Sequence, residues 1–298
     1  MRLPPVKIAV LDLYNNEPNQ GMRCIKEIVG NASGSVANRG VMLDIYDTRY
    51  KTETPGLDYD IYISTGGPGS PYDGVGMEWE NRYFRLIDAI WNHNEGNPES
   101  KKFVFFICHS FQMMARFFKF AVVQERDKRS FGIIPVVKTA SADSDSLFNL
   151  LPRQFYVADF RQFEVISPNE KQLTQLGGNI LARELQRVNP KLERALMGVR
   201  ISNEMIGTQF HPEADPMSML YHFRQPERKH QVVTEHGEEK YYDMIAHLED
   251  PENILLTRER ILPRFLRHAM IQLTPDEYLS ETTLEPLGIL DHKAAANQ

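Results

Sequence analysis

The chain is best understood from the stretch Val104-Phe105-Phe106-Ile107-Cys108-His109-Ser110-Phe111-Gln112, in which an apolar run meets a helix-like segment. The continuous apolar run is typical of a strand in a parallel sheet that is covered on both faces. Phe111, Met114 and Phe118 then recur at helical spacing. Cys108 is therefore predicted to lie where a central strand turns into a helix.

Further strands and helices alternate along the first part of the chain. Apolar strand-length runs occur at residues 6–13, 41–46, 59–64 and 102–108, and helix-length segments occur at residues 21–29 and 79–91. This alternation indicates βαβ units. The predicted fold class is α/β, with a mostly parallel central sheet flanked by helices.

The pattern shortens between about residue 121 and residue 199. Strand-sized pieces at residues 133–137, 154–157, 163–166 and 180–182 are interpreted as antiparallel additions. Residues 195–200 and 205–210 read as a hairpin whose second strand ends at His211. This places His211 at a strand end.

The composition becomes helical and rich in charge after about Asp215. We therefore divide the chain into a main domain, residues 1–215, and a helical C-terminal extension, residues 216–298. The segment Arg224 to Glu239 is dense in charge, which predicts a loop. The apolar residues between 252 and 271 predict amphipathic helices, which we expect to pack on the main domain or, as a second alternative, against a partner in a homodimer.

Composition excludes several classes of protein. The 298 residues are 42% hydrophobic and 25% charged, which is ordinary for a folded globular protein. The net charge is −6 and basic residues are interspersed with acidic ones, so we expect no nucleic acid partner. No stretch has the apolar length of a signal peptide or a membrane span, so no membrane is expected and the predicted location is the cytoplasm.

The chain has two cysteines, Cys24 and Cys108, which cannot form a disulfide-stapled scaffold. Cys24 lies among residues at helical spacing and is interpreted as a small buried hydrophobe. The histidines His222, His230 and His236 are too scattered to predict a metal site. We expect neither a metal nor a cofactor.

Three residues have the chemistry of a thiol-based acyl-transfer site. A thiol at the start of a helix becomes nucleophilic when an imidazole takes its proton, and this predicts Cys108 as nucleophile and His211 as general base and acid. Glu213 follows two residues after His211, so in an extended segment both side chains leave on one side and the carboxylate can orient the ring. The backbone N–H of His109 is then free to stabilise an oxyanion.

A glycine-rich turn, Gly66-Gly67-Pro68-Gly69, follows the strand at residues 59–64. Glycines let backbone N–H groups approach a developing negative charge closely. No Gly-Lys-Ser/Thr sequence follows, which disfavours phosphate binding of the Walker type. All three motifs are expected where strands of one α/β sheet end, which is the usual place for a ligand site.

The same motifs resemble the class I glutamine amidotransferase domain, most nearly the stand-alone proteins similar to the amidotransferase portion of GMP synthase, over about residues 7–213. That family has Gly-x-Cys-x-Gly-x-Gln around its nucleophile and Gln-Phe-His-Pro-Glu at its base. Residues 209–213 match the second motif fully, whereas Phe106 and Ser110 stand where the first motif has glycines.

The resemblance implies a flavodoxin-like α/β fold and an attack of Cys108 on the side-chain amide of glutamine. It further implies oxyanion N–H groups from Gly67 and His109, and substrate binding by Gly69 and Gln112. A thioester would form as ammonia leaves, and water would release glutamate. Because the residues after Glu213 are too few for a synthetase domain, a synthetase accepting the ammonia would have to bind in trans.

Two alternatives remain open at this point. The chain can be a self-contained hydrolase of a γ-glutamyl amide or peptide, with the helical extension as a lid or a dimer contact. It can also be a binding or regulatory module on the same fold, with catalysis blocked at the turn. Phe106 and Ser110 are the residues that favour the second alternative.

Overall fold

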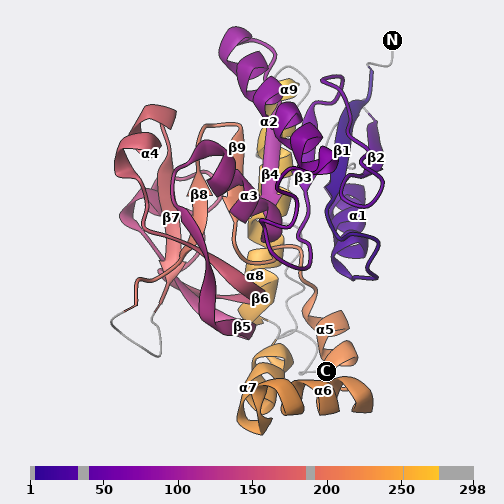
Figure 1. Ribbon diagram of the computed structural model, residues 1–298, viewed down its shortest axis with the longest axis vertical. Coiled ribbons are helices and arrows are strands. Elements are labelled where there is room, and N and C mark those ends of the chain that lie inside the picture. Colours follow the sequence, from indigo (N-terminus) through magenta and orange to yellow (C-terminus); the bar gives the residue numbers. More distant parts are fainter. Residues whose placement is uncertain (1–3, 33–39, 186–191, 251, 275–298) are drawn as a thin grey trace, which may run out of the picture.

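The computed structural model describes residues 4–32, 40–185, 192–250 and 252–274, and a sheet of nine strands runs through its centre (Figure 1). The strands lie in the order β2-β1-β3-β4-β9-β8-β7-β5-β6. The parallel half consists of β2 (Val41–Asp47), β1 (Val6–Asp12), β3 (Ile61–Ser64), β4 (Phe103–Ile107) and β9 (Met205–Thr208). The remaining strands, β8 (Leu196–Arg200), β7 (Asn179–Glu184), β5 (Val122–Lys138) and β6 (Gln154–Ile166), are antiparallel to their neighbours.

This architecture confirms the predicted α/β class with antiparallel additions. Every residue of β3 and β4 is buried, as expected for central strands with both faces covered. Phe106 at the end of β4 lies beside Ser64 of β3 on one side and Gly207 of β9 on the other. The ends of these three strands therefore bring three distant sequence motifs together.

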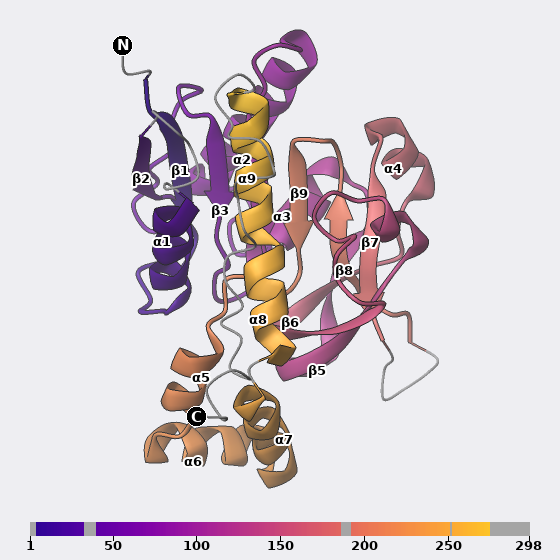
Figure 2. The ribbon, with the colours of Figure 1, turned by 180° about the vertical axis from the view of Figure 1, so that it is seen from behind.

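Helices cover both faces of the parallel half (Figures 1 and 2). On one face, α2 (Glu78–Gly96) and α3 (His109–Phe118) contribute a buried cluster that includes Trp79, Tyr83 and Phe111. On the other face, α1 (Gly21–Ala32) and α9 (Leu262–Leu273) contribute Ile25, Phe265 and neighbouring apolar residues. The apolar spacing that predicted these helices thus corresponds to their buried sides.

The antiparallel half was predicted as separate short strands, but two of its strands are long. β5 and β6 form one long hairpin, with a register shift between Glu125 and Ser130, and a short α4 (Glu170–Leu176) follows β6. The charged residues 125–129 lie at the shift and interrupt the alternation that marks a continuous strand. The pieces predicted at 154–157 and 163–166 belong to one strand, β6.

The hairpin β8–β9 is present, but its second strand ends at Thr208 and not at His211. The Thr208 hydroxyl donates to the carbonyl of Phe210 at 3.0 Å, and the His211 N–H donates to the carbonyl of Ala158 in β6 at 3.0 Å. These bonds take the chain away from the β8–β9 ladder. His211 is therefore held by a turn beside β6.

The segment after Asp215 is helical, with α5 (Pro216–Phe223), α6 (Pro226–His236), α7 (Glu238–Glu249) and α8 (Glu252–Arg260) before α9, and a short 3-10 helix lies earlier in the chain at Ala140–Asp143. The prediction of a loop from Arg224 to Glu239 is wrong. Pro226 begins α6, its charged side chains face solvent, and Val232 packs in a small cluster with Tyr241 and Met244 of α7. Charge density alone does not distinguish such a helix from a loop.

Helices α5, α6 and α7 gather at one end of the molecule, whereas α8 and α9 follow one another along the sheet (Figure 2). The Phe265 ring of α9 packs edge-on against Phe105 of β4 at a centroid distance of 5.1 Å. The last described helix is thus part of the core that supports β4. No helix in the described part of the chain is long and apolar enough to cross a membrane.

Candidate active site

Cys108 is the junction between β4 and α3, and its backbone has φ 50° and ψ −100°. A residue other than glycine in this region stores about 1–3 kcal/mol of strain, so the surroundings must hold it there. The Cys108 N–H donates to the carbonyl of Thr208 at 2.8 Å, and its carbonyl accepts from the N–H of Gln112 at 3.1 Å. The sharp turn places the thiol at the N-terminus of α3.

Ser110 lies within α3, so its backbone does not need the conformational freedom of glycine. Its hydroxyl oxygen accepts from the N–H of Ile107 at 2.7 Å and donates to the carbonyl of Ser64 at 2.7 Å. The side chain is fully buried. Ser110 therefore connects the ends of β3 and β4.

Phe106 is accommodated by a glycine in the neighbouring strand. Gly207 lies beside it in the register of β4 and β9, and a Cβ atom at position 207 would lie 3.1 Å from the Cβ atom of Phe106 and 2.7 Å from Phe111. A side chain at position 207 would therefore require movement of the Phe111 ring and a small shift of the Phe106 backbone. Gly207 gives the two phenylalanines their space.

His211 and Glu213 are in contact, but not through the extended geometry predicted from their spacing. Residues 212 and 213 form a turn, and the N–H of Ala214 donates to the carbonyl of His211 at 3.3 Å. Within this turn, His211 Nδ1 lies 2.8 Å from Glu213 Oε1. The Glu213 side chain is 1% exposed, whereas the His211 side chain is 18% exposed, so the carboxylate is shielded from water and the ring is in part accessible.

The His211 ring lies between Glu213 and Cys108. Burial by itself lowers the pKa of His211, but the Glu213 carboxylate and a hydrogen bond to Cys108 outweigh burial and raise this pKa well above 6.5. Gly66 packs against both residues, since a Cβ atom there would lie 2.8 Å from His211 Cε1 and 3.6 Å from Cys108 Cβ. The glycine-rich turn therefore adjoins both the thiol and the imidazole.

His109 does not share this role although it is adjacent to Cys108. Its ring is 2% exposed, and neither ring nitrogen has a hydrogen-bond partner among the residues that the structure describes. Burial, and then the nearby cations Arg49 and Arg116, lower the pKa of His109 to about 3. The ring is neutral at physiological pH, while the backbone N–H is one of those in the first turn of α3 that lack an acceptor within the helix.

The turn after β3 is fixed by several polar contacts. Gly67 packs against the residue that follows β1, because a Cβ atom there would lie 2.3 Å from the carbonyl oxygen of Leu13. Gly69 has φ +77°, and a side chain there would meet Asp73 rather than the thiol. Asp73 Oδ2 accepts from the Ser70 N–H at 2.9 Å and from Arg49 at 3.2 Å. Sequence reasoning did not identify these two charged residues.

Gln112 belongs to a short chain of side-chain amides that leads to Cys108. Its Nε2 donates to the carbonyl of Phe163 at 3.1 Å and to Gln209 Oε1 at 3.3 Å. Gln209 Nε2 in turn lies 3.9 Å from Cys108 Sγ. The sequence identified Gln209 only as part of the base motif, yet it is the amide that contacts the sulfur.

A buried group of charges lies inside the antiparallel half, close enough for Arg161 to interact electrostatically with Cys108. Arg161 Nη1 donates to Asp159 Oδ2 at 2.7 Å, and Nη2 bonds to Glu184. Arg161 Nε and Asp159 Oδ1 have no partner in the described part of the chain. The charged residues at alternate positions of a strand were the signal in the sequence that could have identified this group.

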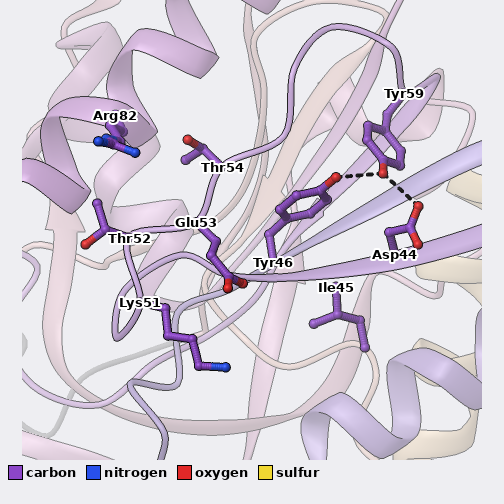
Figure 3. Close-up of a pocket in the computed structure, with 9 residues that line it drawn as sticks. All are labelled: Asp44, Ile45, Tyr46, Lys51, Thr52, Glu53, Thr54, Tyr59 and Arg82. Atoms are coloured by element: carbon purple, nitrogen blue, oxygen red, sulfur yellow. Dashed lines mark hydrogen bonds between the residues drawn. The ribbon is translucent and has the colours of Figure 1, made fainter.

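Two cavities lie apart from the thiol. One, of about 710 Å³, opens beside β2, where Tyr46, Tyr59 and Asp44 form a row of hydrogen bonds (Figure 3). Its cations Lys51 and Arg82 are each paired with a carboxylate. The other, of about 470 Å³, lies beside α5. Among the residues described, no group of three or more His, Cys, Asp or Glu side chains could hold a metal ion.

One family model and several solved structures are similar to this chain. The model of the family "Glutamine amidotransferase class-I" matches residues 24–223. No curated protein sequence matches significantly. Among solved structures, a glutamine amidotransferase of Thermotoga maritima has a TM-score of 0.56 at 17% identity, over 91% of this chain and 97% of that one.

Two further structures share the fold. A protein of Thermoplasma acidophilum described as a GMP synthase subunit has a TM-score of 0.54 at 17% identity, over 89% of this chain and 94% of that one. The glutaminase domain of Trypanosoma brucei CTPS, with bound acivicin, has a TM-score of 0.52 at 14% identity, over 92% and 96%. At these identities the likeness is one of fold.

Proposed function

The chain belongs to the class-I glutamine amidotransferase family, and we propose that it hydrolyses the side-chain amide of glutamine, or of a related γ-glutamyl amide, through Cys108. The observation that carries this proposal is the position of the His211 ring, which is bonded to Glu213 through Nδ1 and packs with Cys108 around Gly66, close enough for the thiol to raise the pKa of the ring. Since Nδ1 engages Glu213, Nε2 is the nitrogen left for the thiol. An imidazole so placed can take the thiol proton and later deliver it to a leaving amine.

The proposed reaction has two steps. The Cys108 thiolate attacks the amide carbon, and the backbone N–H groups of Gly67 and His109 stabilise the oxyanion. The C–N bond breaks as the His211 imidazolium donates its proton, so ammonia leaves and a thioester remains on Cys108. Water, deprotonated by His211, then attacks the thioester and releases glutamate and the thiol. One water molecule is consumed for each amide cleaved.

Gln112, Gly69 and Gln209 are proposed to shape the substrate site. Gln112 and Gln209 present amide groups within the chain that ends at the sulfur, and such groups can exchange their mutual hydrogen bonds for bonds to a substrate. Gly69 keeps the turn in a conformation with positive φ that exposes backbone groups. These roles rest on the resemblance and on the proximity of the amides to Cys108.

The rival hypothesis of a catalytically impaired binding module depends on Phe106 and Ser110. Ser110 bonds to strand ends and Phe106 is accommodated by Gly207, so neither side chain needs the space of the substrate. The strained turn that a nucleophile requires is present at Cys108 itself. These contacts favour the enzyme over the impaired module.

Hydrolysis is tested by incubating the purified protein with glutamine and measuring ammonia and glutamate together. We expect equal amounts of both products, loss of both in Cys108→Ala, and retention in Cys24→Ala, which removes the other cysteine. Acivicin should label Cys108, because the thiolate can displace its chloride. Absence of Cys108-dependent release from glutamine and from a panel of γ-glutamyl amides, with no labelling of Cys108, would refute the proposal.

We further propose that a synthetase in a separate chain accepts the ammonia. The support is that one structural neighbour is described as a subunit of GMP synthase. Copurification of a synthetase that raises the rate of glutamine hydrolysis would agree with this proposal. Full turnover by the isolated chain, unchanged by any copurifying protein, would instead indicate a self-contained γ-glutamyl hydrolase.

A further inference from the structure

Arg258 of α8 contacts the turn that carries His211 and Glu213. Its Nη1 donates to the backbone carbonyl of Glu213 at 2.6 Å, and its Nη2 lies 3.2 Å from Glu27 Oε1 in α1. The Arg258 side chain is 11% exposed and Glu213 is 1% exposed, so the bond to the turn is largely shielded from water, whereas the Glu27 side chain is half exposed. A single guanidinium thus joins α8, α1 and the turn.

Glu27 in turn anchors a second arginine. Its other oxygen, Oε2, lies 3.1 Å from Arg23 Nη1, and Arg23 Nη2 lies 3.3 Å from Asp215 Oδ2 and 2.7 Å from the hydroxyl of Ser218. The residues just after the turn are therefore tied to α1 as well. Arg258 is the member of this network that reaches Glu213 itself.

The Glu213 carboxylate has few other restraints. Oε1 is bonded to His211, whereas Oε2 has no hydrogen-bond partner among the described residues, and neither has the neighbouring hydroxyl of Tyr14. The orientation of the carboxylate thus depends on where the backbone of residue 213 is held. A hydrogen bond from a charged donor is the strong kind, so the bond from Arg258 is well suited to fix that position.

We infer that Arg258 is a positioning residue for the Glu213 carboxylate. Helix α8 would then support the triad of Cys108, His211 and Glu213 from outside the main domain. The inference rests on the proposed amide hydrolysis. Helix α8 lies after residue 223, where the family match ends, and neither the nucleophile nor the base motif includes it. The segment that follows Glu213 in sequence therefore returns to support it.

Loss of Arg258 is expected to act on His211 through Glu213. If the turn shifts, the carboxylate stabilises the imidazolium less well, and the pKa of His211 falls from its raised value. The limb of the pH profile on which His211 loses its proton then moves to lower pH. A role in stability alone would lower the melting temperature and leave this limb in place.

The test measures kcat/KM for glutamine hydrolysis against pH in Arg258→Met, Arg258→Lys and Glu27→Gln. We expect roughly a tenfold loss in Arg258→Met at alkaline pH, equivalent to a shift of about one pKa unit. Arg258→Lys should recover part of the lost activity. Glu27→Gln, which removes a partner of Arg258 without removing its bond to the turn, should give a smaller shift of the alkaline limb in the same direction. Arg260→Met, in the same helix and with no bond to the turn among the described residues, serves as the control.

A double-mutant cycle tests whether the effect passes through Glu213. In a Glu213→Gln background, Arg258→Met should add less than about a twofold loss, because the carboxylate that it positions is already absent. A wild-type pH profile in both Arg258→Met and Glu27→Gln, or full additivity with Glu213→Gln, would overturn the inference. Hydrolysis that survives Cys108→Ala would overturn the proposed function instead, so the two failures are distinct.

Arg258→Met could also fail to fold, and the remaining variants then decide the question. Circular dichroism and thermal melting establish whether each variant is folded before its profile is interpreted. With a folded Glu27→Gln and Arg258→Lys, unchanged alkaline limbs in both would equally overturn the inference. Shifted limbs with unchanged KM would support it.

Discussion

The Ser110 hydroxyl donates to the carbonyl of Ser64 at 2.7 Å and thereby fastens the first turn of α3 to the end of β3. The same oxygen accepts the N–H of Ile107, so it bonds to backbone groups of two neighbouring strands. These bonds hold the backbone on both sides of the strained residue Cys108. The serine therefore serves the geometry of the turn.

Replacing Ser110 should reduce the stability of the fold. It should not enlarge the substrate site, because the Ser110 hydroxyl is bonded to the ends of β3 and β4. In Ser110→Ala the Ser64 carbonyl and the Ile107 N–H lose a buried partner, which is expected to cost about 1–3 kcal/mol in the free energy of unfolding. Urea denaturation measures this loss, with the exposed Ser100→Ala as the control. If Ser110→Gly were equally stable and hydrolysed glutamine much faster, the serine would be an obstruction and not a support.

Gly66→Ala should impair the reaction while the fold is retained. The added methyl group would lie 2.8 Å from His211 Cε1, and the ring can move where backbone could not. Displacement of the ring by a few tenths of an ångström or more weakens its bond to Cys108, and we expect roughly a hundredfold loss in kcat, within the range attributed to general acid–base catalysis. Steady-state kinetics test this, with Gly96→Ala, which has open space, as the control.

A loss below about twofold in Gly66→Ala would mean that the imidazole does not need its observed position. The melting temperature of the variant distinguishes this outcome from unfolding, since a folded variant with a displaced ring melts near the wild type. The control is informative because, apart from its chain neighbours and the adjacent helix backbone, no atom of the described residues lies within 4 Å of a Cβ atom built on Gly96.

His109 should make the protein sensitive to acid. Its pKa is about 3 in the folded protein against 6.5 in the unfolded chain, so the unfolded state binds more protons between these values. The stability contributed by the neutral ring is therefore fully present above pH 6.5 and falls as the pH decreases toward 3. Between about pH 6.5 and pH 5 this contributes a loss of about 2 kcal/mol.

The measurement is urea denaturation of wild type and His109→Gln at several pH values. The variant should lose less stability on acidification, whereas His230→Gln at an exposed site should follow the wild type. Parallel pH dependences of wild type and His109→Gln would contradict a buried neutral ring at position 109.

The local features of the site could be predicted from the sequence because each depends on residues that are close together in the chain. The run from Val104 to Gln112 contains both the apolar strand and the helical spacing, so the turn at Cys108 follows from periodicity. The contact of His211 with Glu213 was also predicted, although the backbone there is a turn and not extended. Two side chains so close in sequence meet in either geometry.

Features that depend on distant residues could not be predicted. Nothing near Phe106 in the sequence indicates that Gly207 provides its space, because their proximity comes from the pairing of β4 with β9. The continuity of β5 was hidden by the charged residues at its register shift. Arg258 follows Glu213 at a distance that no spacing rule connects, and only the packing of α8 brings them together.

The ion pair between Arg161 and Asp159 is buried, and removing its cation should cost more stability than breaking an exposed pair. The Arg161 and Asp159 side chains are 1% and 0% exposed, so Arg161→Met leaves a carboxylate in the interior without its cation. Breaking one side of a buried pair is expected to cost about 3–5 kcal/mol, whereas exposed pairs contribute less than about 1 kcal/mol. Arg82→Met, which breaks the exposed pair with Glu78, is the matched comparison.

The double variant Asp159→Asn/Arg161→Met should be more stable than Arg161→Met alone, because the neutral amide no longer needs a cation in the interior. Chemical denaturation of the three variants measures these differences. Equal costs for Arg161→Met and Arg82→Met would show that water or rearrangement compensates the Asp159 carboxylate, which would contradict the expected cost of a buried unpaired charge.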